Sequence, residues 1–160
     1  MHIDSTRFGR IEIRDDAVIT FADGIIGLPG TRYALLAQTE ASAFLWLHSV
    51  EDPSVALPVT NPWFFFPGYA VDVADGDAAA LGLDRAEAAD IFCVVRAAES
   101  LEDFTVNLRG PIVVNGETRA ARQVINQSTP YGVREPLFSE VELEDARTAA
   151  PATPVAAMGV

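Results

Sequence analysis

A long apolar and aromatic stretch, residues 44–67, limits the folds open to this chain of 160 residues. Both tryptophans of the chain lie in it. In residues 44–50 apolar side chains fall on both sides of an extended backbone, which is typical of a strand that is buried on both faces. Pro53 fixes φ and has no N–H, so residues 51–54 are predicted to turn the chain into a second strand at residues 55–59. The stretch therefore predicts a buried hairpin around which the rest of the chain is arranged.

Short extended segments, separated by turn residues, continue on both sides of this hairpin. Further strands are predicted at residues 7–14, 17–21, 31–38, 69–73, 91–97 and 104–108, and in a last hairpin at residues 111–114 and 117–125. The Asn115-Gly116 pair of the last hairpin is typical of a type I′ turn, which needs positive φ at both central residues. About nine short strands with this regular spacing favour a closed or nearly closed antiparallel barrel, because closure removes exposed strand edges.

The alanine-rich part of the chain between Asp75 and Ala89 has a different pattern. Asp75, Asp77 and Asp84 stand on the N-terminal sides of two alanine-rich runs, where carboxylates cap free amides and complement the helix dipole. One or two short helices are predicted there. The fold class that follows is mainly β: a small antiparallel β-barrel-like single domain with one short helical insertion near residues 75–89.

The composition changes again at Ser139. Acidic residues are followed by Ala, Pro and Thr, with almost no large apolar side chains. Such a segment buries too little apolar surface to offset the entropy cost of becoming ordered. We therefore predict a barrel domain at residues 1–138 and an acidic, then Ala/Pro-rich, disordered tail at residues 139–160.

The charge balance restricts the partners. All eleven basic residues are Arg, and the formal net charge is −12. Since nucleic-acid binding draws most of its affinity from basic side chains on phosphates, direct DNA or RNA binding is not expected. The acidity favours a basic protein partner, although it also increases solubility without any partner. No apolar run reaches the roughly 18 residues of a membrane-spanning helix, and no secretory signal is visible, so a cytoplasmic protein is expected.

The residues that usually carry catalysis do not form a recognisable constellation. The nucleophile-elbow, phosphate-loop and dinucleotide-binding motifs are absent from the sequence, and no HxH, HxxxH or CxxC spacing suggests a metal site. Cys93 lies in an apolar run and is predicted to be a buried thiol. His48 is predicted to be a core or partner-facing histidine with one hydrogen-bond partner. Residue chemistry therefore indicates a non-enzymatic binding or assembly protein without a cofactor.

Four separated parts of the sequence carry a family resemblance. They are TRFGRIEI followed by ITFADGIIGLPG, then WLHSVEDPSVALPVTNPWFFFPGY, FTVNLRGPIVVNGETRAARQV and STPYGVREPL. Together they resemble the FliW family of bacterial flagellar assembly factors over nearly all of residues 6–137. The resemblance implies a β-barrel protein without enzymatic activity that binds the basic translational regulator CsrA and, alternately, flagellin. It also implies a switch: flagellin bound to FliW leaves CsrA free to repress flagellin translation, and secretion of flagellin frees FliW to sequester CsrA.

The resemblance also implies contact residues, because the family pattern NL-x-x-PI-x-x-N occurs at residues 107–115. The expected partner-binding residues are Asn107, Leu108, Arg109, Pro111, Ile112 and Asn115, with Glu51 and Asp52 at the tip of the central hairpin. For Leu108 and Ile112 the alternative is a place in the barrel interior, and for Asn115 it is turn chemistry. Replacing Asn107 and Arg109 together is expected to weaken partner binding without loss of thermal stability.

A second class of function stays open from the residues alone. Many β-barrels bind a small ligand or cofactor in the interior. A filled, apolar interior would count against such a site. The crowding of large aromatic side chains between Phe44 and Phe66 favours a filled barrel.

Overall fold

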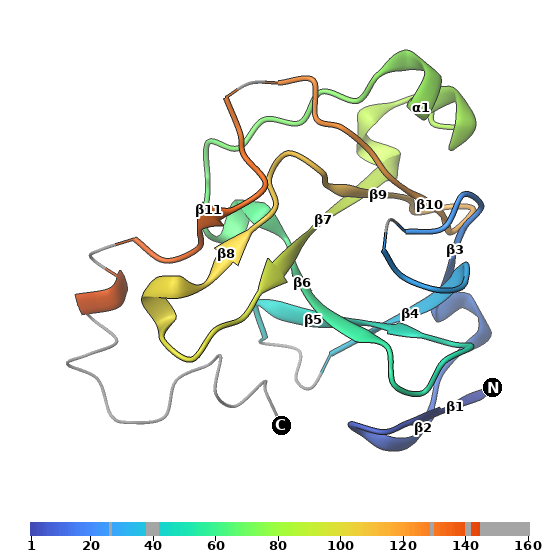
Figure 1. Cartoon of the computed structure of the whole chain (residues 1–160). Coiled ribbons are helices and arrows are strands. Elements are labelled where there is room, and N and C mark those ends of the chain that lie inside the picture. The colour runs from blue at the N-terminus through green and yellow to red at the C-terminus, as the bar shows by residue number, and fades with distance from the viewer. Residues whose placement is uncertain (26, 38–41, 129, 140–141, 145–160) are drawn as a thin grey trace.

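The computed structural model describes residues 1–25, 27–37, 42–128, 130–139 and 142–144. Seven strands close into a barrel (Figure 1). In order around the barrel they are β7 (Ala89–Arg96), β6 (Ala56–Thr60), β5 (Phe44–Ser49), β4 (Arg32–Leu36), β3 (Val18–Phe21), β10 (Ala120–Gln123) and β9 (Ile112–Asn115), which pairs back onto β7. Neighbouring strands are antiparallel except β3 and β10, which are parallel. The mainly β, barrel-like fold predicted from the sequence is confirmed, with this one parallel pair added.

Shorter elements surround the barrel. β1 (His2–Ser5) and β2 (Gly9–Glu12) form a separate two-stranded sheet, whereas β8 (Thr105–Val106) extends the barrel sheet between β7 and β11 (Glu135–Pro136). The helical elements are α1 (Asp75–Ala80) and the 3-10 turns η1 (Asp15–Ala17), η2 (Pro62–Phe64), η3 (Ala86–Ala88) and η4 (Leu101–Asp103). The predicted helical insertion is therefore confirmed as α1 and η3.

The interior of the barrel is packed with apolar side chains from the strands of the barrel wall. The fully buried members of this cluster are Ile19, Phe21, Ile25, Tyr33, Leu47, Val59, Ile112, Val114 and Ala121. Phe21 and Tyr33 meet edge to face, with ring centroids 5.7 Å apart, which is a favourable aromatic geometry. A filled interior counts against the alternative of a small ligand bound inside the barrel.

Three groups of residues cover the outer wall. The β1–β2 hairpin lies against β5, where Phe8 and Trp46 meet edge to face at 5.6 Å. A second cluster, which includes Cys93 and Phe104, packs under β8 and β11. A third, around Leu81, joins the end of α1 to β9. Each cover buries apolar side chains that point away from the interior, so β5 and β7 are buried on both faces.

The aromatic stretch is the central hairpin that its pattern predicts, but its aromatic residues do not fill the barrel. Leu45 and Leu47 face the interior cluster, while the alternating Trp46 lies on the outer side. Trp63 and Phe64 follow in η2 and are 39% and 64% exposed. The interior is filled instead by residues from neighbouring strands.

The prediction of a strand at residues 69–73 is wrong. This segment has no regular secondary structure and forms no strand pairing with another described element. The backbone of this segment forms hydrogen bonds with the side chain of Asn126 and with the backbone of Gln127. Asp72 N donates to Asn126 Oδ1 at 2.9 Å, Asn126 Nδ2 donates to Ala70 O at 2.9 Å, and Gln127 N donates to Asp72 O at 2.9 Å.

The prediction of a type I′ turn at Asn115-Gly116 is also wrong. β9 and β10 pair antiparallel as predicted, but Asn115 is the last residue of β9 and is only 3% exposed. The loop spans residues 116–119, and positive φ falls on Arg119 at 65° and not on Gly116. Arg119 N donates to Asn115 O at 2.8 Å. The buried side-chain amide of Asn115 forms hydrogen bonds with Leu81 O, Glu117 N and Thr118 N. The chain therefore turns at residues 116–119 and not at Asn115-Gly116.

The chain after Phe138 is described in part. Ser139 N donates to Glu142 Oε1 at 2.9 Å and Glu142 N donates to Ser139 Oγ at 3.1 Å, a reciprocal capping of the helical turn at residues 142–144. Residues 140–141 and 145–160 lie outside the described residues. The boundary near residue 138 and the disorder of the tail therefore remain predictions.

Candidate functional site

One end of the barrel opens into a hollow of about 330 Å³, which we call the mouth. Its lining residues are Ile25, Leu28, Leu57, Val94, Arg96, Thr105, Asn107, Gln123, Val133 and Arg134. Leu28, Leu57 and Val94 are half-buried and continue into the interior cluster. The mouth is therefore the place where the barrel core reaches the surface.

Four sequence segments that carry the family resemblance meet at the mouth, whereas the TRFGRIEI segment at residues 6–13 contributes no lining residue. Residues 19–30, 46–69, 104–124 and 128–137 each contribute at least one lining residue, and the remaining ones belong to β7. These segments are separated by up to about a hundred positions along the chain, and barrel closure brings them together. This convergence makes the mouth the candidate functional site.

Asn107 lines the mouth and also builds the loop that follows β8. Its backbone N–H donates to Val94 O at 3.0 Å. Its Oδ1 accepts from Arg109 N at 3.1 Å and from Gly110 N at 2.8 Å. A Cβ added at Gly110 would lie 3.0 Å from Asn107 Nδ2, so the loop fits closely around this side chain. Replacing Asn107 is therefore expected to lower stability, contrary to the expectation drawn from the sequence.

The other residues of the 107–115 pattern divide between surface and interior. Arg109 is exposed. Leu108 and Ile112 are each 1% exposed, and Pro111 is buried. Arg109 is therefore accessible at the surface, whereas the apolar residues of the pattern hold the loop in position.

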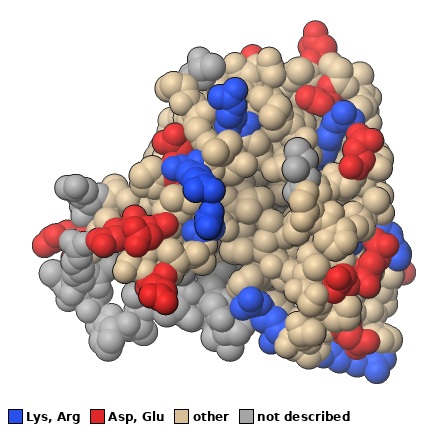
Figure 2. Space-filling view, in the orientation of Figure 1, with Lys and Arg blue, Asp and Glu red and all other residues tan. Residues whose placement is uncertain are grey.

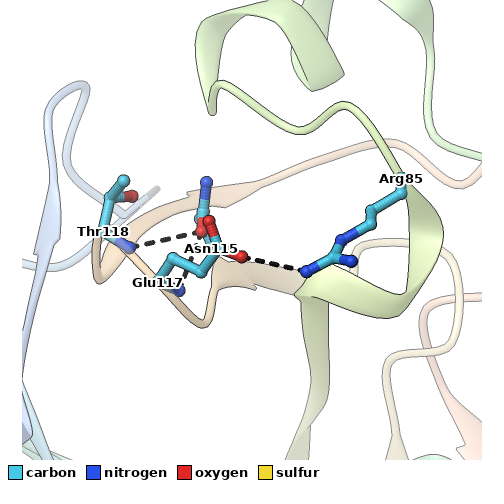
Figure 3. A network of polar contacts seen from close by, with 4 residues as sticks. All are labelled: Arg85, Asn115, Glu117 and Thr118. Carbon is cyan, nitrogen blue, oxygen red and sulfur yellow. Dashed lines mark hydrogen bonds and ion pairs between the residues drawn. The ribbon is translucent and has the colours of Figure 1, made fainter.

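Asn115 is the buried centre of a polar network (Figure 3). Its Nδ2 donates to Leu81 O at 2.9 Å, and its Oδ1 accepts from Glu117 N at 2.9 Å and from Thr118 N at 3.3 Å. Arg85 then pairs with Glu117 at 3.1 Å across the exposed side of the loop. Asn115 thus fixes the β9–β10 loop to the end of α1 and lies away from the mouth.

Glu51 and Asp52 lie at the tip of the β5–β6 hairpin, and both act as local caps. Glu51 Oε1 accepts from Thr31 N and Arg32 N, each at 3.0 Å. Asp52 Oδ1 accepts from Ser54 N at 2.9 Å and Ser54 Oγ at 2.7 Å. These hydrogen bonds hold the pKa of both carboxyl groups below their ordinary values, so both stay charged near neutral pH. Glu51 also fastens the segment just after Leu28, one wall of the mouth.

The bonds of Glu51 predict a pH-dependent contribution to stability. Because its pKa is lowered on folding, the charged carboxylate stabilises the fold at pH 7, and this contribution is lost as the pH falls below the ordinary glutamate value of 4.5. Urea unfolding of the wild type and of Glu51→Gln should show the largest difference at pH 7 and a shrinking one below 4.5. Glu12→Gln, at an exposed position of β2, is the control. A Glu51→Gln difference independent of pH would contradict the capping role.

A buried polar residue that the sequence analysis missed, Asn126, holds the loops beside the mouth together. It is 4% exposed, and its Nδ2 donates to Tyr69 Oη at 3.1 Å as well as to Ala70 O. Tyr69 Oη in turn donates to Leu108 O at 2.6 Å. Burial raises the pKa of Tyr69 well above its ordinary value, and burial also raises the pKa of Cys93, next to it, to about 12. We call Asn126 and Tyr69 the latch. Asn126 lies outside every predicted strand, and the strand predicted at residues 69–73 gave no indication of the partners of Tyr69.

Arginine dominates the charge around the mouth. Figure 2 shows one group of arginine side chains left of the middle of this face, while other arginines lie farther out, several of them close to acidic side chains. Arg96 and Arg134 are both exposed lining residues. No Asp or Glu is among the residues that line the mouth in the described part of the chain. The electrostatics of this site are therefore opposite to the net charge of the chain.

Two further observations bear on the class of site. Within the described ranges, no group of three His, Cys, Asp or Glu side chains is arranged to hold a metal ion. None of the helices found in those ranges has the length and apolar character needed to cross a membrane.

Comparison with known proteins gives a consistent result. A family model described as FliW protein matches residues 2–137. The flagellar assembly factor FliW of Bdellovibrio bacteriovorus is 36% identical over 143 residues, which cover 89% of this chain and 82% of that protein. The flagellar assembly factor FliW of Natranaerobius thermophilus is 34% identical over 142 residues, with 88% and 94% covered. A crystal structure of the flagellar assembly factor FliW matches with a TM-score of 0.79 at 30% identity, over 88% of this chain and 99% of that one.

Proposed function

Because the chain belongs to the FliW family of flagellar assembly factors, we propose that it binds a CsrA-type translational regulator and, alternately, flagellin. In its complex with flagellin it leaves the regulator free to repress flagellin translation. When flagellin is secreted, the chain is released and sequesters the regulator. The role is that of a non-enzymatic binding protein that couples flagellin synthesis to secretion. The convergence of the four resemblance-carrying segments at the mouth is the observation that supports it most.

Electrostatics support a basic partner for the acidic part of the surface. The chain carries 23 acidic residues against 11 arginines. A basic RNA-binding regulator is attracted to such a surface, and an acidic protein bound beside its RNA site repels the phosphates of the RNA. The regulator would then lose RNA through charge repulsion as well as through a shift in its own conformation.

Exposure divides the expected contact residues into two roles. Arg109 and Glu51 are exposed and Asp52 is half-buried, so a partner reaches them without any rearrangement. The buried members of the 107–115 pattern act indirectly, since they hold the loop that presents Arg109. The proposed contact surface therefore includes Arg109 and the exposed side of the mouth beside it.

Binding measurements test this proposal. The purified chain, titrated with flagellin and with a CsrA-type regulator from the same cell, should form complexes with a Kd between about 1 nM and 1 µM, and flagellin should displace the regulator. Arg109→Ala should weaken binding to at least one partner about tenfold, because exposed arginines often anchor interfaces, while the melting temperature stays the same. Arg14→Ala, an exposed arginine that follows β2, is the control and should bind as the wild type does.

Two outcomes would count against parts of the proposal. If neither protein binds, the partner assignment is wrong. If both bind but Arg109→Ala binds as the wild type does, the partners use another surface. A salt series separates the electrostatic part: inhibition of RNA binding that is unchanged as ionic strength rises would remove charge repulsion from the mechanism.

A further inference from the structure

Two arginines at the mouth have no partner within the described structure. Arg96 ends β7 and Arg134 precedes β11, and neither forms an ion pair or side-chain hydrogen bond with another described residue. Arg122, by contrast, pairs with Asp23 at 2.9 Å and with Asp77 at 2.8 Å. In a chain with twice as many acidic as basic residues, two unpaired arginines beside one hollow form a local cationic site. Such a site attracts carboxylates.

The floor of the mouth is aliphatic. Leu28, Leu57 and Val94 are half-buried there, and Val133 is 56% exposed at the rim. Contact with an aliphatic side chain would remove this apolar surface from water, which contributes roughly 25 cal/mol for each Å² buried. The mouth therefore suits a ligand that combines a carboxylate with an adjacent aliphatic group.

The size and shape of the mouth favour a protein segment over a small metabolite. Its volume of about 330 Å³ is at the small end of the range of ligand sites, and it is open to solvent. Small-molecule sites usually enclose most of the ligand, which this hollow does not. Asn107 lines the mouth, and its side chain lies close to Gly110, so it adds a polar group beside the aliphatic floor.

We infer that the mouth binds an acidic-aliphatic segment of a partner protein. A carboxylate side chain of that segment meets Arg96 and Arg134, and a neighbouring aliphatic side chain packs on Leu57 and Val94. This inference rests on the proposed function only in taking the partners to be proteins. It adds a second kind of contact: the acidic surface attracts a basic partner, while the mouth selects a segment of opposite character.

Two blocked peptides test the inference without flagellin or the regulator. The probes are acetyl-Ala-Leu-Glu-Leu-Ala-amide and the same peptide with Gln in place of Glu, titrated into the full chain and followed by amide chemical shifts. The Glu peptide should bind about tenfold more tightly, because charge-assisted bonds to arginine are stronger than neutral ones. The preference should decrease as salt is added. The shifts should centre on the residues that line the mouth.

Matched variants assign the preference to the two arginines. Arg96→Gln/Arg134→Gln should lose the preference for the Glu peptide, whereas Arg96→Lys/Arg134→Lys, which keeps the charge, should retain most of it. Arg10→Gln/Arg14→Gln changes the net charge equally on the β1–β2 side and should bind as the wild type does. Equal binding of both peptides, no binding of either, or a preference that survives Arg96→Gln/Arg134→Gln would overturn the inference.

A small-molecule arm separates the two sources of a carboxylate. N-acetylglutamate should bind at least about tenfold more weakly than the Glu peptide, since it lacks the aliphatic neighbours and most of the backbone. Equal affinity would overturn the assignment to a protein segment. Because these assays contain neither flagellin nor the regulator, the inference fails or stands separately from the proposed function.

Discussion

Replacing Asn126 with alanine should lower the free energy of unfolding by about 3 kcal/mol, since the buried Tyr69 hydroxyl and several part-buried backbone groups lose a partner at once. Asp72 N and Ser128 N lose their acceptor, and Ala70 O loses its donor. For a chain of this size the melting temperature should fall by about 10 °C. Amide exchange in residues 69–73 should accelerate most, because that segment has no strand partner and depends on this side chain.

Asn61→Ala is the matched control for the latch. Asn61 also accepts a backbone hydrogen bond, from Trp63 N at 3.0 Å, but it is half-buried and caps only the 3-10 turn η2. Its loss should cost about 1 kcal/mol. Equal destabilisation by the two changes would contradict the latch as the bond that holds residues 69–73. The latch also holds Leu108 O, which precedes Arg109. Asn126→Ala is therefore expected to weaken the binding of any partner that contacts Arg109.

Replacing His48 with leucine should release the β1–β2 hairpin and lower the free energy of unfolding by about 2–3 kcal/mol. His48 is fully buried, and its Nδ1 lies 2.7 Å from Ser49 O. A carbonyl only accepts, so Nδ1 carries a proton, and Nε2 shares a hydrogen bond with Ser5 Oγ at 2.8 Å. Ser5 Oγ in turn accepts from Phe8 N at 3.0 Å. Leucine preserves the apolar volume but removes the buried hydrogen-bond partner of the Ser5 hydroxyl.

The second histidine provides the control for this prediction. His2 lies on the same hairpin but is exposed, and its Nδ1 is 3.1 Å from Arg10 Nη2. His2→Leu should change the free energy of unfolding by less than about 0.5 kcal/mol. Amide exchange over β1 and β2 should accelerate in His48→Leu and not in His2→Leu. Unchanged exchange in His48→Leu would show that the hairpin is held by its apolar contacts alone.

The sequence was most informative where one residue type dominates a regular pattern. The two-faced apolar run at residues 44–50 predicts a buried strand because alternation is a property of the backbone itself. The strand predicted at residues 69–73 failed for a different reason: its hydrogen-bond partner is the side chain of Asn126, more than fifty positions away. Similarly, local propensity favours a turn at Asn115-Gly116, but the side-chain amide of Asn115 is buried and donates to Leu81 O, so the turn forms after it. Long-range side-chain bonds leave no periodic trace in a sequence.

The candidate site was predictable only in part for the same reason. The resemblance located Asn107, which lines the mouth, and Arg109, which is exposed, and the alternative of a buried position for Leu108 and Ile112 is confirmed. Arg96 lies outside the resemblance-carrying segments, and Arg134 looks unremarkable among eleven arginines. The fold places Arg96 and Arg134 beside one hollow and away from acidic partners, and this proximity cannot be seen in the sequence.

The parallel pairing of β3 with β10 has a consequence for how the protein is made. β3 ends at Phe21, and β10 begins at Ala120, so the seam between them joins the start of the chain to a segment synthesised about a hundred residues later. Until β10 has left the ribosome, β3 keeps an open edge and the barrel cannot close. Contacts so distant in sequence also slow folding. Each newly made molecule therefore becomes able to bind its partners only after almost the entire described domain has been translated.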